Sequence, residues 1–310
     1  MNGAADGGRL RLARRVVELY PELTFTRAKR AVEGGQVTVD GEQIADAGSW
    51  VTPAQTVQWD RNRPLARVAT GPSVELAHVD EDVVVAVKPA GLLTLPTPAR
   101  EKDTLLGRVS TAMARRRTAG SPRVFVAVVH RLDKETSGLV AFALGRRGVE
   151  SLQAQLEDHS MERSYLAILE GEIERDAGTF DRALVGDGTR RRRWVAKPGE
   201  RGKPAVTHWR VERRFAGATL VRVRLETGRT HQIRIHFAAA GFPVLGERVY
   251  RPLRMEKAEL VAPRQMLHGG ELAFRQPSTG RRIELTTPPP PDFAAVLEGL
   301  GAPRRGRGRS

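Results

Sequence analysis

The sequence predicts an α+β protein in which a small segment at residues 9–60 precedes a larger sheet domain at residues 74–297. Apolar residues recur at helical spacing in a few segments, whereas alternating or continuous apolar runs of strand length are more numerous. Glycine and proline separate many of these runs. Strand segments with interspersed helices favour an α+β domain built on a sheet.

Length and composition limit the classes of protein to consider. A chain of 310 residues provides for one large or two modest domains with a core that needs no disulfides. The absence of cysteine excludes disulfides, thiolate nucleophiles and cysteine zinc sites, and it fits a reducing compartment. No apolar run approaches the roughly 20 residues of a spanning helix, and residues 1–8 lack the apolar core of a signal peptide. We therefore expect a soluble, cytoplasmic protein without a membrane partner.

The chain is strongly basic. Lys and Arg number 51 against 36 Asp and Glu, which gives a formal net charge of +15. Such an excess is typical of proteins that bind a phosphate-rich partner, although a general basic bias of composition gives the same charge. The polar, Gly- and Arg-bearing ends at 1–8 and 298–310 are expected to be disordered, and the aperiodic stretch at 61–73 is expected to be a linker.

The segment before the linker has a helix–helix–strand pattern. Apolar residues at helical spacing predict a first helix over 10–19. Thr26 is placed to cap a second helix, which the glycine pair at 34–35 ends. Residues 36–40 alternate as a strand, and Asp40-Gly41 predicts a hairpin turn.

The larger domain shows strand patterns with two helices among them. We expect paired strands within 74–97 with a turn at Lys88–Gly91, further strands at 124–130, 163–172, 205–215, 218–227 and 282–291, and helices at 104–116 and 148–161. The sequence contains no dinucleotide-binding fingerprint and no Walker-type phosphate loop, so we expect no nucleotide cofactor.

Asp133 lies between two apolar strand segments in an unusually polar turn. His130 and Arg131 precede it, and the hydroxyls of Thr136 and Ser137 follow it. These hydroxyls can fix the turn by local hydrogen bonds, which would hold the carboxylate in place. From the residues alone, Asp133 is a turn former, a member of an ion pair, a metal ligand or a nucleophile.

The motif HRLDKETSGL at 130–139 resembles the signature of the RluA-type pseudouridine synthases. Other segments agree with that family in order: EDVVVAVKPAGLL at 81–93, ERSYLAILEG at 162–171, GRTHQIRIHFAAAGFPVLGERVY at 228–250 and LHGGELAFRQPSTGRRIELTTPPPPDF at 267–293. The resemblance implies that family's fold, a central mixed, mainly antiparallel sheet with flanking helices. Glu247 stands where the family usually has Asp, Gly269 where Ala is usual and Gln276 where His is common. We expect none of these departures to touch the reaction centre.

A second resemblance covers the segment before the linker. Residues 24–44, TFTRAKRAVEGGQVTVDGEQI, are similar to the small alpha-L (ribosomal-protein-S-four-like) RNA-binding module that is attached to several RNA-modifying enzymes. The resemblance implies that Arg27, Lys29 and Arg30, near the start of a helix, contact RNA phosphates. The alternative is an ordinary solvated helix face.

The first resemblance implies isomerisation of uridine in RNA to pseudouridine, a redox-neutral reaction without metal or other cofactor. Asp133 would be the essential carboxylate, acting as nucleophile on the sugar or as base toward its 2′ proton; the sequence does not choose between these roles. Arg234 would orient Asp133 through an ion pair. Arg229 would contact phosphate at the surface.

Three further residues receive roles from the same resemblance. Tyr165 would stack on the uracil, with its hydroxyl reaching the ring to assist removal of the last proton; the alternative is a core aromatic of a strand. Ile233 would form an apolar wall under the base, although any buried strand contains such a residue. Arg131 would fill the gap left by a uridine that is flipped out of a stem.

Other polar groups receive lesser interpretations. His130 and His231 invite comparison with hydrolases, but no nucleophile elbow accompanies them, so we interpret both as structural or RNA-contacting. The arginine run at 190–193 is expected to be a solvated loop that meets phosphate. Two alternatives stay open: an inactive RNA-binding or ribosome-assembly factor on the same scaffold, and an aspartyl-phosphate enzyme that needs Mg²⁺, with a metal loop at 185–188.

The sequence does not identify the target uridine. The attached RNA-binding module favours large-subunit ribosomal RNA over transfer RNA as the partner. We expect the protein to act as a monomer.

Overall fold

The computed structural model describes residues 10–33, 36–44, 47–61, 73–97, 101, 103–116, 125–186, 193–251 and 261–301. Contacts within the chain divide it into two compact units, 1–73 with 101–103 and 107–124, and 74–100 with 104–106 and 125–310. The expected disordered start at 1–8, nearly all of the expected linker and most of the expected tail lie outside the described residues. The proposed limits of the domains therefore stay predictions.

Residues 10–61 of the first unit form two short helices and five short strands. They are β1 (Leu10–Arg11), α1 (Leu12–Leu19), α2 (Phe25–Glu33), β2 (Val37–Val39), β3 (Glu42–Gln43), β4 (Trp50–Val51) and β5 (Val57–Trp59). Strands β3, β2 and β5 form an antiparallel sheet in that order, and β1 pairs with β4. Both helices contribute to one apolar core with β2, β4 and β5, which contains Leu12, Val16, Ala28, Val32, Val37, Val51 and Val57.

Two local expectations for this unit have different outcomes. The hairpin turn between β2 and β3 is confirmed, because Asp40 and Gly41 both have positive φ, at 53° and 84°. The expectation that Thr26 caps the second helix is wrong. The helix already begins at Phe25, and the amide of Arg27 donates to the Thr24 hydroxyl at 3.4 Å. Thr24 therefore occupies the capping position, because its side chain reaches the third amide that follows it.

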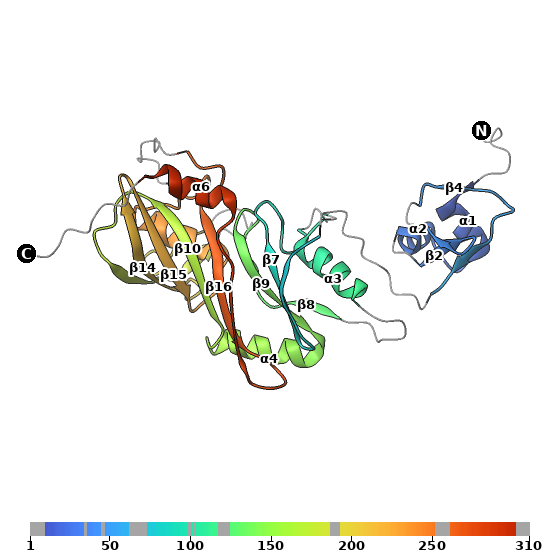
Figure 1. Ribbon diagram of the computed structural model, residues 1–310, viewed down its shortest axis with the longest axis horizontal. Helices are drawn as coiled ribbons and strands as arrows, with labels where there is room; N and C mark the ends of the chain where they lie inside the picture. Colours follow the sequence, from blue (N-terminus) through green and yellow to red (C-terminus); the bar gives the residue numbers. More distant parts are fainter. Residues whose placement is uncertain are drawn as a thin grey trace, which may run out of the picture. The chain divides into compact units, whose positions relative to one another are not determined.

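The second unit is built on a ten-stranded sheet (Figure 1). Its strands are β6 (Leu76–Val79), β7 (Val83–Lys88), β8 (Val126–Val128), β9 (Ser137–Leu144), β10 (Glu162–Glu170), β11 (Ala177–Asp181), β14 (Val206–Phe215), β15 (Ala218–Leu225), β16 (Leu267–Arg275) and β17 (Arg282–Thr286). The order along the sheet is β11-β14-β15-β10-β16-β9-β7-β6, with β17 added to β16 and β8 added to β9. A separate pair is formed by β12 (Leu184–Gly186) and β13 (Arg193–Val195).

All neighbouring strands of the large sheet are antiparallel except β9 and β16. This parallel contact pairs Ser137 with His268 and Gly138 with Gly269. A Cβ on Gly138 would lie 2.2 Å from the Gly269 carbonyl oxygen, and its φ of 127° also favours glycine. The two strands thus approach closely at the point where β9 leaves the turn that carries Asp133.

In the described part of the second unit, three helices accompany this sheet: α4 (Gly145–Glu157), α5 (Gln232–Ala239) and α6 (Pro291–Gly299). A further helix, α3 (Leu105–Arg115), begins in the second unit, but its residues from Gly107 onward belong to the first. Leu152 of α4 joins the apolar core formed by β7, β9 and β16, and Phe293 of α6 joins the core formed by β10 and β15. The helices expected at 104–116 and 148–161 are confirmed, although α4 both begins and ends earlier in the chain than expected. Helix α6 extends past the predicted domain end at 297. Among the described residues, none of the helices combines the length and the apolar character needed to cross a bilayer.

Candidate active site

The turn between β8 and β9 carries Asp133 and is hydrogen-bonded to a buried lysine. The amide of Thr136 donates to the Asp133 carbonyl at 3.1 Å, which closes the turn. The side chain of Lys88 at the end of β7 is inaccessible to solvent, and its ammonium donates to the carbonyls of Lys134 at 2.9 Å and Leu92 at 2.6 Å. Burial lowers the pKa of Lys88 to about 7. These hydrogen bonds fix the backbone immediately after Asp133.

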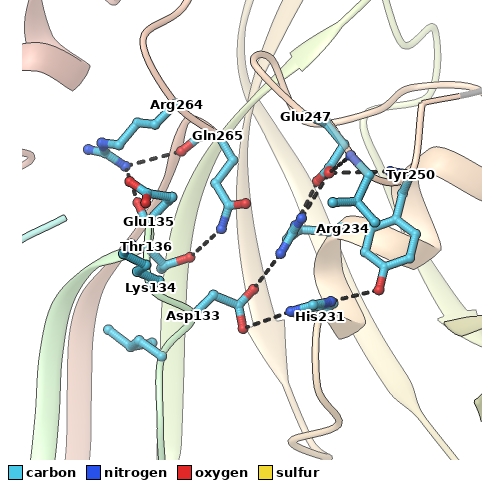
Figure 2. A network of polar contacts seen from close by, with 12 residues as sticks. Asp133, Lys134, Glu135, Thr136, His231, Arg234, Glu247, Tyr250, Arg264 and Gln265 are labelled. Carbon is cyan, nitrogen blue, oxygen red and sulfur yellow. Dashed lines mark hydrogen bonds and ion pairs between the residues drawn. The ribbon is translucent and has the colours of Figure 1, made fainter. Parts of the chain in front are cut away.

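Side chains from elsewhere in the chain hold the same turn. The Thr94 hydroxyl donates to the Leu132 carbonyl at 2.9 Å, and the Gln265 amide donates to the Thr136 hydroxyl at 2.9 Å. The guanidinium of Arg264 donates to the Glu135 carbonyl at 2.9 Å. Figure 2 shows Gln265 and Arg264 beside the residues that follow Asp133 in the turn. The backbone around Asp133 is therefore fixed by long-range contacts as well as by its own hydroxyls.

Asp133 forms an ion pair with Arg234, which comes from α5. One guanidinium nitrogen of Arg234 lies 3.1 Å from Asp133 Oδ2, and the other two donate to Glu247 at 2.6 and 2.8 Å (Figure 2). Burial opposes the charge of Glu247, but hydrogen bonds from Arg234 and from the amides of Val249 and Tyr250 outweigh it and hold its pKa below the ordinary value. Glu247 thus fixes the plane of the guanidinium that faces Asp133.

His231 contacts the second oxygen of Asp133. Its Nε2 lies 3.7 Å from Asp133 Oδ1, and its Nδ1 is 2.6 Å from the Tyr250 hydroxyl. His231 adopts the left-handed conformation, with φ at 59°, directly before α5 begins. Burial lowers the pKa of His231 below its ordinary 6.5, although the charge of Asp133 opposes this effect. The ring is therefore neutral at neutral pH.

Asp133 opens into a cavity of about 500 Å³. Its side chain is 16% exposed, so the carboxylate is reachable but largely removed from solvent. Tyr165 of β10 and Ile233 of α5 line the cavity and are buried. A Cβ on Gly269 would lie 3.2 Å from the Tyr165 ring, so β16 packs closely behind this ring. Burial raises the pKa of Tyr165, and the phenol is protonated at neutral pH.

Comparison with known proteins identifies the family. Residues 82–239 match the family described as RNA pseudouridylate synthase. The chain is 36% identical over 278 residues to the uncharacterized RNA pseudouridine synthase YlyB of Bacillus subtilis, with 89% of each chain covered. It is 35% identical over 300 residues to the ribosomal large subunit pseudouridine synthase D of Pseudomonas aeruginosa, which covers 94% of this chain and 92% of the relative. The chain belongs to the RNA pseudouridylate synthase family.

A solved structure agrees with the fold of this synthase. The human RNA pseudouridylate synthase domain containing 1 superposes with a TM-score of 0.57 at 24% identity, over 75% of this chain and 89% of that chain. The predicted α+β fold with a mixed, mainly antiparallel sheet and the RluA-type resemblance are confirmed. The protein is an RNA-modifying enzyme, so the alternative of an inactive factor is set aside.

The structure gathers most of the residues selected from the sequence around one cavity of the synthase. The cavity is lined by Asp133, Arg131, Tyr165, Arg229, Ile233 and Arg234. Arg27, Lys29 and Arg30 are exposed on α2 of the first unit. In the arginine run and in the supposed metal loop, residues 187–192 lie outside the described residues. Among the described residues, no group of three or more His, Asp or Glu side chains has a metal-binding arrangement.

The expectation that the departures from the family pattern avoid the reaction centre is wrong for two of the three. Glu247 is bonded to Arg234, and Gly269 packs against Tyr165. Gln276 is remote from both and donates to Asp82 at 3.1 Å. The interpretation of His231 as structural or RNA-contacting also omitted its contact with Asp133. His231 and Glu247 lie near Arg234 in the sequence, and this proximity was the signal that could have predicted their place beside Asp133.

Proposed function

We propose that this synthase converts uridine to pseudouridine in structured RNA, specifically in large-subunit ribosomal RNA, by a metal-independent reaction that depends on Asp133. The observation that carries the proposal is the pairing of Asp133 with Arg234 at a cavity that also contains Tyr165. This carboxylate is largely removed from water and is oriented by a guanidinium that Glu247 holds through two hydrogen bonds. Such a carboxylate is suited to react with a bound ribose.

Asp133 would act on the sugar of a nucleotide bound in the cavity. As a nucleophile it would form a bond to C1′ while the bond from C1′ to the ring nitrogen breaks; as a base it would take the 2′ proton while the same bond breaks. Arg234 serves both routes, because it holds Oδ2 at 3.1 Å while Glu247 keeps the guanidinium in its plane.

Tyr165 and Ile233 would hold the detached uracil while it turns to present its ring carbon to C1′. The tyrosine ring provides a surface for stacking, and Ile233 provides an apolar wall. Because burial raises the pKa of Tyr165, its hydroxyl is available as a hydrogen-bond donor to the ring at neutral pH. Removal of the last proton through this hydroxyl would need a further acceptor to take the phenol proton.

Arg131 would support extrusion of the target nucleotide. It is exposed at the cavity, and it forms no ion pair with any residue that the structure describes. An exposed guanidinium next to the reaction centre can enter the stack that the uridine leaves and bond to the orphaned partner.

The proposal that the substrate is large-subunit ribosomal RNA rests on the names of relatives and on the positive charge of the chain. The Pseudomonas aeruginosa relative, which aligns with 94% of this chain, is named for the ribosomal large subunit. The net charge of +15 and the exposed basic residues of α2 are suited to a highly folded RNA. Comparison of pseudouridine maps of total RNA from cells with and without the gene identifies the target and tests the choice of ribosomal RNA.

The decisive test of the chemistry is Asp133→Asn, which preserves shape and removes the charge. We expect folding and RNA affinity close to the parent and a loss of pseudouridine formation of at least about a thousandfold in single-turnover reactions. The parent should retain full activity in EDTA once the RNA is folded. Substantial turnover by the asparagine variant, or a strict Mg²⁺ requirement with folded RNA, would contradict the proposal.

A further inference from the structure

The charges around Asp133 do not balance when only the ion pair with Arg234 is considered. Asp133 and Glu247 each contribute a carboxylate, whereas Arg234 contributes one guanidinium to both. His231 is neutral at neutral pH, because burial lowers its pKa. The ammonium of Lys88 donates to the backbone carbonyls of Leu92 and Lys134, and Lys88 does not line the cavity. Besides Arg234, the cavity is lined by the exposed Arg131 and Arg229 and by one further arginine that is buried.

Arg163 is a second buried guanidinium at this cavity. It lies on β10 two residues before Tyr165, so both side chains project from the same face of the strand. The residue is only 6% exposed and lines the cavity. Its positive charge is close enough to lower the pKa of both Tyr165 and His130, although burial is the larger influence on each. Arg163 therefore projects its charge onto the part of the cavity where Tyr165 lies.

Not every N–H group of the Arg163 side chain has a hydrogen-bond acceptor. Its Nη2 donates to the Glu226 carbonyl at 2.9 Å, but its Nε is buried and has no acceptor. Among the described residues, Arg163 has no carboxylate within ion-pair distance, whereas the buried Arg234 and Arg264 are paired with Glu247 and Asp292. A buried guanidinium without a counter-charge is costly. A buried polar group that lacks a partner in a native structure needs an explanation, and a catalytic role is one of them.

Breaking the glycosidic bond supplies a matching negative charge. In either route open to Asp133, the electron pair of the bond from C1′ to the ring nitrogen passes to the uracil, which becomes an anion delocalised over that nitrogen and its carbonyl oxygens. When the ring carbon bonds to C1′, the ring becomes neutral again, and Asp133 is released as its bond to C1′ breaks or as it returns the 2′ proton to C2′. The ring carbon then loses its proton and the ring nitrogen gains one, so the reaction is balanced. The uracil anion thus exists only from cleavage of the bond between C1′ and the ring nitrogen until formation of the bond between C1′ and the ring carbon. The reaction needs no external reactant.

We propose that Arg163 is a catalytic residue that stabilises the detached uracil anion. The inference rests on the proposed function, and it adds the group that counters the charge of the leaving base. A fixed cation in a largely dry cavity favours an anion that exists only during the reaction, so Arg163 acts on the rate more than on RNA binding. The exposed Arg229 is placed to meet the RNA backbone instead, and the exposed Arg131 is placed to enter the stack that the uridine leaves.

The position of Arg163 depends on a glycine. A Cβ on Gly228 would lie 2.7 Å from Nη1 of Arg163, so Gly228→Ala displaces the guanidinium without removing its charge. Arg163→Gln removes the charge, and Arg163→Lys retains it without the planar group. These variants separate the charge of Arg163 from its position.

The test compares uridine with 5-fluorouridine at the target position of the same RNA. Fluorine withdraws electrons and stabilises the ring anion, so the leaving base needs less help from the enzyme. We expect Arg163→Gln to reduce single-turnover consumption of uridine by about 100-fold or more, as is typical when one preorganised charge-stabilising group is removed. Consumption of 5-fluorouridine should fall clearly less, and Arg163→Lys and Gly228→Ala should lie between the parent and Arg163→Gln.

Arg229→Gln is the matched control, since this arginine also lines the cavity but is exposed. Arg229→Gln should reduce the consumption of uridine and of 5-fluorouridine by the same factor, and this reduction should arise from weaker RNA binding. Equal losses on uridine and 5-fluorouridine for all three variants at Arg163 and Gly228, or losses confined to RNA affinity, would overturn the assignment. The parent's own yield of pseudouridine tests the proposed function separately, so the two failures are distinguishable.

Discussion

Glu247 holds Arg234 through both of its carboxylate oxygens, at 2.6 and 2.8 Å, whereas Asp133 receives one hydrogen bond from the same guanidinium. The side chain of Glu247 is inaccessible to solvent. Glu247→Ala removes two buried hydrogen bonds to a charged group, each worth about 1.5–3 kcal/mol, while Asp133 still counters the charge of Arg234. We therefore expect the free energy of unfolding to fall by about 3–5 kcal/mol. Thermal and denaturant unfolding measure this loss.

A milder substitution of Glu247 tests how it positions Arg234 without a large loss of folding stability. Glu247→Asp keeps the charge and introduces the residue that is usual in the family, but it shortens the side chain by one methylene. We expect a folded protein with reduced kcat and nearly unchanged KM, because Arg234 still pairs with Asp133 in a less constrained plane. A variant with parental kcat would show that the two-point contact does not position Arg234 for the reaction.

The neutral ring of His231 predicts a decline of activity in acid. The pKa of His231 lies below its ordinary 6.5, so the ring takes a proton only as the pH falls below that value. Protonation places a second cation 3.7 Å from Asp133 Oδ1, where it competes with the substrate for the carboxylate. Because the unfolded chain binds this proton more readily, the folded state is also disfavoured in acid.

Single-turnover rates between about pH 5 and 8 measure this effect. The parent should lose activity with a midpoint below pH 6.5. His231→Gln cannot titrate in this range and should lose the acid decline that is due to this ring, even if its rate at neutral pH is lower. An identical acid decline in parent and variant would assign the titration to another group.

The sequence reveals Asp133 and its turn because the signals there are local. Two apolar runs flank a cluster of His130, Arg131 and Asp133, and the hydroxyls that hold the turn follow within a few residues. The strands on either side are β8 and β9, which pair with each other. Short-range patterns of this kind predict an element and its turn without knowledge of the rest of the fold.

The partners of Asp133 are harder to predict because they depend on a helix without a helical pattern. Every residue of α5 from Gln232 to Ala238 is buried, so no polar face alternates with an apolar one. The left-handed His231 and the return of the chain to Glu247 and Tyr250 follow from packing around this helix. The parallel contact between β9 and β16 joins residues more than a hundred positions apart, which no local pattern indicates.

Deleting residues 1–60 should weaken RNA binding without removing the chemistry. Every residue that lines the cavity lies after Asp133 or within the few residues before it, whereas the deletion removes Arg27, Lys29 and Arg30. We expect pseudouridine formation to persist at high RNA concentration. The log–log dependence of affinity on salt should become less steep by about 0.7–0.9 for each RNA phosphate that the shortened protein no longer neutralises.

A full-length variant controls for damage caused by the truncation. Arg27→Gln with Arg30→Gln changes two exposed side chains of α2 and leaves the apolar core of the first unit intact. It should reproduce part of the change in affinity and salt dependence. Parental binding by both proteins would show that the first unit serves a purpose other than RNA binding.

The role proposed for Arg131 separates extrusion of the uridine from the reaction itself. Arg131 is exposed at the cavity two residues before Asp133. If it fills the stack that the uridine leaves, Arg131→Ala should impair modification of a uridine in a stem more than that of an unpaired uridine, by part of the few kcal/mol that unstacking costs. Each 1.4 kcal/mol or so corresponds to about tenfold in rate, so even a partial effect is measurable.

Single-turnover modification of a stem-embedded and an unpaired uridine by each variant provides the measurement. Asp133→Asn is the matched control, because loss of the reactive carboxylate should impair both substrates equally. Arg131→Lys should recover little of the loss on the stem, since an ammonium lacks the planar surface that enters a stack. Equal impairment of the two substrates by Arg131→Ala would remove the role in extrusion and assign Arg131 to support of Asp133 or to contact with the reacting nucleotide.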